Sequence, residues 1–115
     1  MIYKELLAKG EIKKESIKPS QIIKSINRAE QDIKSAQTLL ASNEVAAFKL
    51  AYDSMLLAGR ALVFAYGFRP RASGSHKIVV DFSTDILGAE YRVLTSKFNK
   101  MRKKSMRAIK RSYEQ

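Results

Sequence analysis

The apolar residues of this chain recur every three or four positions, and no stretch alternates with a period of two. Such spacing is typical of amphipathic α-helices. The clearest stripe lies in residues 20–41 and consists of Ile22, Ile26, Ala29, Ile33, Ala36 and Leu40. We expect a helix there with Ser20 as its N-cap, because a serine hydroxyl can accept a hydrogen bond from a free N–H of the first turn.

A second helix is predicted from about residue 42 to Gly67, since glycine readily adopts the left-handed conformation that ends helices. Its inward stripe consists of Phe48, Tyr52, Met55, Gly59, Leu62 and Tyr66, with Leu56 and Val63 widening it. Alanines fill many of the intervening positions, which favours a central helix packed on several sides. Gly59 is unfavourable in mid-helix, so its presence indicates a close helix crossing.

Two further helices are expected after a loop that contains Pro70 and Gly74. One spans residues 75–87 and ends at Gly88, with its inward stripe formed by Ile78, Val79, Phe82 and Ile86. The last runs over residues 89–113, where Tyr91, Leu94, Phe98 and Met101 begin a stripe that weakens towards the C-terminus. A short leader helix is predicted for residues 2–9.

Together these patterns predict an all-α fold, an antiparallel four-helix up-and-down bundle with a short N-terminal leader helix. The length of 115 residues suits one domain. We divide it into a leader segment, residues 1–19, and the bundle, residues 20–115.

The composition limits the kinds of site and partner that the chain can have. The chain has no cysteine and one histidine, which excludes a disulfide framework and disfavours a metal site, so neither metal nor cofactor is expected. It contains no apolar run of 18 residues, which argues against a signal peptide or membrane span and favours a cytoplasmic location. Its formal net charge of +11 favours polyanionic partners.

The positive charge is concentrated near the C-terminus. Eight basic residues and no acid occur between residues 97 and 111: Lys97, Lys100, Arg102, Lys103, Lys104, Arg107, Lys110 and Arg111. On a helix, all except Lys97 and Arg102 fall on the face opposite Phe98 and Met101. Such a face can be solvated surface that complements the helix dipole. It lacks the mixed signs that form stabilising i,i+4 pairs, which favours an anionic partner.

Arg102 and three further polar residues are also candidates. Arg102 lies at the edge of the inward stripe, so it either extends along the surface to solvent or points into a cleft. Asp53 and Arg60 share one helix face, where they form a surface ion pair or a subunit contact or, alternatively, line a polar cleft. His76 follows Ser75 at the start of a helix; it could act as a general base only with a hydrogen-bonded partner, and none is evident from the sequence.

The segment 51–62, AYDSMLLAGRAL, resembles the central helix of HEPN domains. The next segment is also similar to that family: a glycine, a basic loop with Pro70, then Ser75-His76 opening a helix. Finally, FNKMRKK at 98–104 resembles the start of the family's signature helix. The resemblance covers about residues 20–113.

The resemblance implies a helical bundle, usually dimeric, that either cleaves RNA without a metal or is an inactive partner of a nucleotidyltransferase in toxin–antitoxin or defence systems. Active members carry an Arg, four to six residues, then a His near the last helix. No histidine follows Arg102 at that spacing, and Arg71 and His76 have it only in the wrong segment. The motif is therefore degenerate.

The sequence supports three hypotheses. The first is a non-catalytic, homodimeric HEPN-like module that acts with RNA or a partner protein. The second is a metal-independent ribonuclease using Arg102 or the Arg71/His76 pair. The third is an assembly module with an acidic protein partner.

Overall fold

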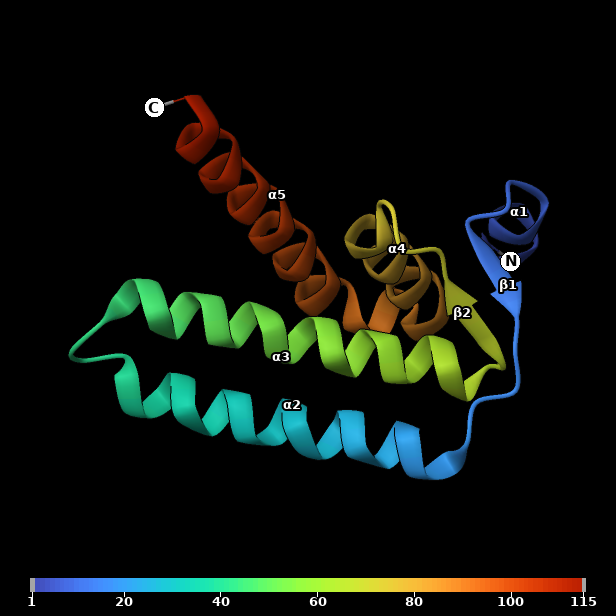
Figure 1. Ribbon diagram of the computed structural model, residues 1–115, viewed down its shortest axis with the longest axis horizontal. Coiled ribbons are helices and arrows are strands. Elements are labelled where there is room, and N and C mark those ends of the chain that lie inside the picture. Colours follow the sequence, from blue (N-terminus) through green and yellow to red (C-terminus); the bar gives the residue numbers. More distant parts are fainter. Residues whose placement is uncertain (1, 115) are drawn as a thin grey trace.

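The computed structural model describes residues 2–114, apart from the side chains of Met106 and of residues 108–114. The elements in chain order are α1 (Ile2–Ala8), β1 (Ile12–Lys14), α2 (Pro19–Leu39), α3 (Glu44–Ala65), β2 (Phe68–Pro70), α4 (Ser75–Leu87), a 3-10 turn η1 (Ala89–Tyr91) and α5 (Arg92–Glu114) (Figure 1). The predicted all-α class is confirmed, with one small two-stranded sheet added.

Several predicted helix ends are confirmed by their local chemistry. The Asn43 side chain caps α3 by accepting a hydrogen bond from the Ala46 N–H at 3.1 Å. Gly67 and Gly88, with φ of 83° and 73°, follow α3 and α4. A positive φ costs glycine little because it has no Cβ, so the chain turns away at both points.

The predicted N-cap of α2 is wrong. The helix begins at Pro19, and Lys18 is its N-cap, with no side-chain capping bond. Proline suits the first helical position because its ring presets φ and its missing N–H would have had no partner inside the helix. Ser20 therefore lies inside the first turn, and its hydroxyl is not the cap.

The small sheet was not predicted. Strands β1 and β2 pair antiparallel, with Ile12 opposite Pro70 and Lys14 opposite Phe68. Each strand has only three residues, too few to display an alternating pattern. The pairing brings the N-terminal segment onto the helices, and Leu6, Ile12 and Phe68 are buried in one hydrophobic cluster.

The helices are arranged around α3. In Figure 1, α2 and α3 form a long antiparallel pair, while α5 runs away from that pair at an angle. Helix α4 packs on α3 and α5, and α1 packs on α4. The main contacts of α2 are with α3, and those of α5 are with α4 and α3. The predicted four-helix antiparallel arrangement is therefore not confirmed.

This open arrangement explains why parts of the predicted stripes are not buried. On α2, Ala29 and Ala36 are buried, but Ile33 and Leu40 are 40% and 61% exposed. A helix that packs mainly on one neighbour hides only a narrow strip of its surface. Tyr91 and Leu94, also predicted to point inward, are exposed on η1 and α5, and Tyr66 is exposed as the C-cap just after α3.

The core lies where α3 crosses α4 and α5. Val63, Val79 and Phe82 are completely buried there. Gly59 permits the crossing, because a Cβ at this position would overlap Val79 Cγ1 and lie 3.1 Å from Ser83 Oγ. The close crossing predicted from the mid-helix glycine is confirmed.

Candidate functional site

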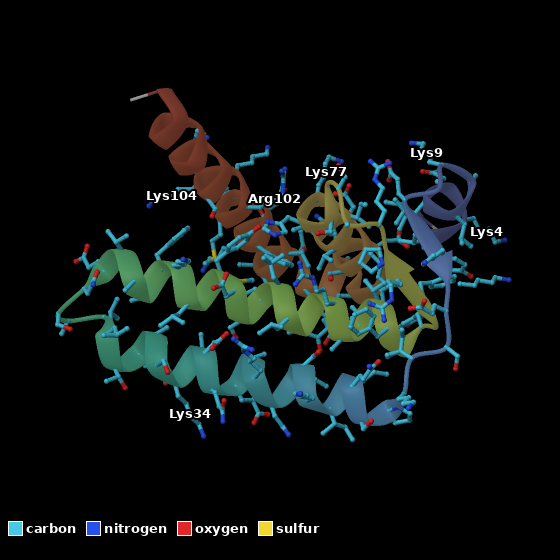
Figure 2. The ribbon with its side chains drawn as sticks, viewed as in Figure 1. Lys4, Lys9, Lys34, Lys77, Arg102 and Lys104 are labelled. Atoms are coloured by element: carbon cyan, nitrogen blue, oxygen red, sulfur yellow. The ribbon has the colours of Figure 1, made fainter. Side chains whose placement is uncertain are left out.

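The basic segment of α5 presents a row of exposed cations. We call this row the basic ridge; its members are Lys97, Lys100, Lys103, Lys104 and Arg107, all exposed. Lys110 and Arg111, the other two predicted members of the basic face, lie outside the residues whose side chains the structure describes. Figure 2 shows Lys104 on this outlying helix.

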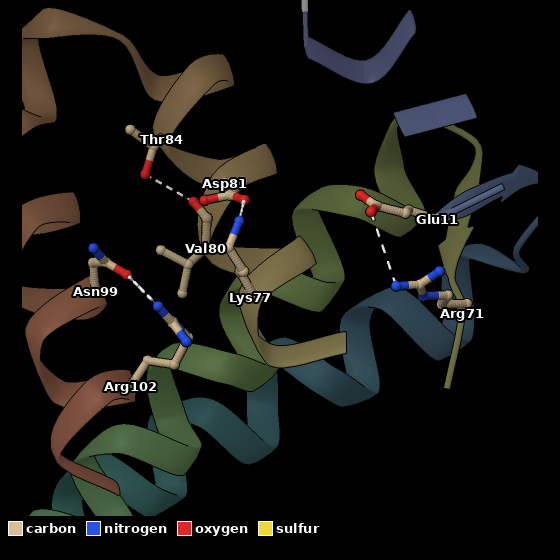
Figure 3. Close-up of polar contacts among 8 residues, drawn as sticks. All are labelled: Glu11, Arg71, Lys77, Val80, Asp81, Thr84, Asn99 and Arg102. Atoms are coloured by element: carbon tan, nitrogen blue, oxygen red, sulfur yellow. Dashed lines mark hydrogen bonds and ion pairs between the residues drawn. The ribbon is translucent and has the colours of Figure 1, made fainter. Parts of the chain in front are cut away.

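The ridge cations are not neutralised by acids within the described part of the chain. Its ion pairs are Arg69–Glu15, Arg71–Glu11 and Lys77–Asp81, and the last two are drawn in Figure 3. None of these pairs involves α5. Like charges on one helix face repel one another, so a bound anion would reduce the repulsion between the ridge cations.

Lys104 contacts a neighbouring helix. Its Nζ lies 4.9 Å from the centroid of the Phe48 ring on α3, so the side chain reaches across to the neighbouring helix although it is exposed. A cation over an aromatic face is attracted by the ring quadrupole. Lys104 is exposed, as expected for the basic face, but its contact with Phe48 also links α5 to α3.

Arg102 lies on the inner side of α5. Its Nε and one terminal nitrogen donate to Asn99 Oδ1 at 3.2 and 3.1 Å (Figure 3). The side chain is half-buried, and its charge acts to lower the pKa of both Tyr52 and His76. The side chain is thus held along α5 by Asn99 and its charge acts on groups of α3 and α4.

His76 has the hydrogen-bond partner that the sequence did not reveal. Tyr52 Oη lies 3.1 Å from His76 Nδ1, and the two rings meet edge to face with centroids 5.8 Å apart. Tyr52 occupies the inward stripe of α3, and its apolar neighbours gave no reason to read it as more than a packing residue. Its hydroxyl was the available signal, because a buried tyrosine usually needs a partner.

The surroundings of this pair shift both pKa values away from the charged forms. Burial lowers the pKa of His76 below its usual 6.5, and the positive charges of Arg60 and Arg102 lower it further against the opposing effect of Asp53. Burial also raises the pKa of Tyr52. At neutral pH both side chains are therefore uncharged.

We call Tyr52, Asp53, Arg60, His76 and Arg102 the interhelical polar cluster. It joins α3, the start of α4 and the middle of α5. A neutral imidazole can accept a proton, and guanidinium groups can stabilise an anion. The cluster thus contains groups suited to acid–base chemistry or to anion recognition.

The two other sequence candidates have different outcomes. Arg71 donates from Nε to the Ser73 carbonyl at 2.9 Å and lies 3.9 Å from Glu11, whereas His76 bonds to Tyr52. Within the described chain, no hydrogen bond or ion pair joins Arg71 to His76. Asp53 and Arg60 form no ion pair with each other in the described chain, so the surface ion pair is not supported, and their charges act on the pKa values of Tyr52 and His76.

Metal ligands are not clustered in the described residues, where no three His, Asp or Glu side chains come together in a way that could hold an ion. Over the same residues, none of the helices combines the length and apolar character that crossing a membrane requires.

Comparisons with protein-family models, with curated proteins and with solved structures found no match to this chain.

Proposed function

We propose that this chain is a basic, non-catalytic HEPN-like module that binds RNA through the basic ridge of α5. The observation that carries the proposal is the row of exposed ridge cations without an acid partner in the described chain. A helix rises about 1.5 Å per residue, so lysines and arginines along several turns can follow consecutive phosphates. The ridge itself has no aromatic side chain, which favours backbone contact over base readout.

The experiment is a fluorescence-anisotropy titration of single-stranded RNA at several salt concentrations. The ridge variant replaces Lys100, Lys103 and Arg107 with Gln, and it leaves Lys104 in place because Lys104 contacts Phe48. Loss of three phosphate contacts should flatten the log–log salt slope by about two units.

A matched control replaces Lys4, Lys34 and Lys49, which are exposed on α1, α2 and α3. Each triple variant lowers the formal net charge from +11 to +8, so a general loss of charge affects both equally. Equal slopes for the two variants, or no binding by the wild type at low salt, would remove the ridge as the RNA site. The assembly-module hypothesis, with an acidic protein partner, would then replace it.

A second candidate function is a metal-independent ribonuclease. The Tyr52–His76 hydrogen bond and the nearby charge of Arg102 support it. In this candidate, neutral His76 takes the proton of the 2′-hydroxyl as that oxygen bonds to phosphorus, and the 5′-oxygen leaves and takes a proton from water. The positive charge of Arg102 would stabilise the charge that develops on the phosphate oxygens. Cleavage of single-stranded RNA by the purified protein, lost in both His76→Ala and Arg102→Gln, would favour this candidate; RNA left intact would favour the non-catalytic module.

The proposed assembly is a homodimer. Large apolar residues remain exposed on α2, including Ile23 and Leu40 at 57% and 61%, and a second copy packed there would complete the antiparallel bundle. Light scattering should give twice the 13.0 kDa chain mass. Ile23→Glu with Leu40→Glu should give the monomer mass, while Ile23→Leu should keep the dimer; a wild-type monomer would contradict the proposal.

The resemblance further suggests the setting, a cytoplasmic toxin–antitoxin or defence system in which a nucleotidyltransferase is the partner protein. Co-expression with the product of a neighbouring nucleotidyltransferase gene, followed by size-exclusion chromatography, tests this association. Elution as separate species would oppose it.

A further inference from the structure

A second concentration of positive charge lies far from the ridge in the sequence. Two adjoining hollows of about 350 and 600 Å³ share the side chains of Ser25, Leu57, Phe64 and Arg69. They form one open groove between α2, α3 and the two-stranded sheet. We call it the basic groove, and its cationic lining consists of Lys13, Lys24, Arg28, Arg60, Arg69 and Arg71.

The groove retains excess positive charge after its internal pairing. Arg69 pairs with Glu15, and Arg71 with Glu11. The other four cations, Lys13, Lys24, Arg28 and Arg60, have no ion-pair partner in the described part of the chain. Six cations and two paired acids leave a net charge of +4 around the groove, which attracts an anion of several charges.

Some of the groove is held in place by contacts that do not need a ligand. The guanidinium of Arg69 lies 5.2 Å from the centroid of the Phe64 ring and is hydrogen-bonded to Glu15. The backbone N–H of Arg71 donates to the Glu11 carbonyl at 2.8 Å, next to the pairing of β1 and β2. Figure 3 shows the Glu11–Arg71 pair beside these strands. A lining that is already ordered loses less conformational entropy on binding.

The floor of the groove is apolar. Leu57 and Phe64 are half-buried and line both hollows. A basic rim above an apolar and aromatic floor matches single-stranded nucleic acid, which offers phosphates to the rim and base or sugar faces to the floor.

We infer that the basic groove binds single-stranded RNA as a second contact surface, separate from the basic ridge. The choice of RNA as ligand rests on the proposed function, whereas the location rests on the groove itself. The sequence does not display this site, because its cations come from β1, α2, α3 and the segment after α3, and the fold brings them together.

The test uses the full chain and a fluorescein-labelled single-stranded RNA, with anisotropy measured at several salt concentrations. The groove variant replaces Lys13, Lys24 and Arg28 with Gln; all three are exposed, so the fold should be retained. It should flatten the log–log salt slope by about two units. The ridge variant and the control variant at Lys4, Lys34 and Lys49 carry the same charge change.

The variants separate this inference from the proposed function. If the groove variant binds like the control and the ridge variant is impaired, the groove inference fails and the ridge proposal stands. If only the groove variant is impaired, the ridge proposal fails and the groove is the RNA site. If both are impaired, both sites contribute; if the wild type does not bind, both are overturned.

Phe64 distinguishes RNA from a simple polyanion. Phe64→Leu should weaken RNA binding about fivefold or more, since a base–aromatic contact contributes about 1–3 kcal/mol, and should leave the salt slope unchanged. The same variant should bind inorganic polyphosphate like the wild type. Equal RNA affinity for Phe64→Leu and wild type would show that the groove recognises charge alone and would overturn the assignment to nucleic acid. Circular dichroism verifies that each variant is folded.

Discussion

The two parts of α3 are stabilised in different ways. From Tyr52 to the end of the helix, α3 is covered by α2 on one side and by α4, α5 and the sheet on others. Before Tyr52 the cover comes mainly from α2, and Val45 is 81% exposed. The part of α3 from Tyr52 onwards, which we call the enclosed region, buries large side chains such as Val63 and Leu56. The part before Tyr52, the open region, buries the small side chain of Ala47.

The same helix is therefore central at one end and peripheral at the other. Small residues let α2 and α3 approach closely, and the Ser54 hydroxyl donates to the Ala29 carbonyl at 2.7 Å. This pair hides little apolar area per residue. We expect the free energy of unfolding to depend strongly on the enclosed region and weakly on the open one.

The largest effect is expected for Phe82→Ala in the enclosed region. Phe82 is completely buried between α1, α3 and β2 residues, and truncating such a side chain typically costs about 3–5 kcal/mol. Urea unfolding followed by circular dichroism measures it. Val45→Ala, in the open region, is the control and should change the stability by less than about 0.5 kcal/mol. Similar losses of unfolding free energy in both variants would contradict the difference between the enclosed and open regions.

Gly59→Ala should have the next largest effect on the free energy of unfolding. Alanine favours a helix over glycine by about 1 kcal/mol, but its Cβ would overlap Val79 Cγ1, and overpacking a core costs about 1–3 kcal/mol. We expect a net loss of about 1 kcal/mol. A gain in stability would show that the crossing is looser than its geometry indicates.

A double-mutant cycle sharpens the Gly59 result. Val79→Ala should cost less in the Gly59→Ala background than in the wild type, because it removes the group that the new methyl overlaps. Ala58→Gly, on the exposed neighbouring position, reports the helix-propensity term alone and should cost about 1 kcal/mol. Additive effects at Gly59 and Val79 would argue against a direct clash.

Ser54→Ala tests the contact that joins α2 to α3. Removing the hydrogen bond to the Ala29 carbonyl should lower the free energy of unfolding by about 1 kcal/mol. Ser35→Ala is the control, since Ser35 is exposed on α2. Hydrogen exchange should show faster opening of α2 in Ser54→Ala than in the wild type. Unchanged stability and exchange would mean that the small-residue packing holds the two helices together without this bond.

The smallest effect is expected from His76 on α4, which is hydrogen-bonded to Tyr52 at the start of the enclosed part of α3. Because its pKa in the folded protein is below the usual 6.5, the unfolded chain binds the proton more readily. The contribution of neutral His76 is therefore complete above about pH 6.5 and is lost as the pH falls below it. Urea unfolding between pH 7.5 and 5 should show a smaller acid loss in His76→Gln than in the wild type.

Nuclear magnetic resonance can test the same shift directly, because the chain has one histidine. The pH midpoint of the His76 imidazole titration should lie below 6.5. It should rise in Arg60→Gln and in Arg102→Gln, each of which removes one of the two positive charges that lower the pKa. Lys34→Gln, a surface control, should not move it. A midpoint at or above 6.5 in the wild type would contradict the proposed surroundings of His76.

Much of the local structure could be predicted from the sequence. Helices α3 (Glu44–Ala65) and α4 (Ser75–Leu87) lie within about two residues of their predicted bounds, because caps, glycines and apolar spacing act within a few residues. The basic ridge was visible for the same reason, since its cations are neighbours along one helix. Ser20 was misassigned as a cap because Pro19 offered a competing helix start.

The tertiary structure alone decided which residues from distant segments meet. Apolar spacing says which face of a helix avoids water, but it does not say whether a neighbour will cover that face, and on α2 much of it stays exposed. The three-residue strands β1 and β2 are defined by pairing with each other across the chain. Likewise, Tyr52 meets His76 across 24 positions, and the cations of the basic groove come from four separate segments, because chain packing sets these distances and local sequence does not.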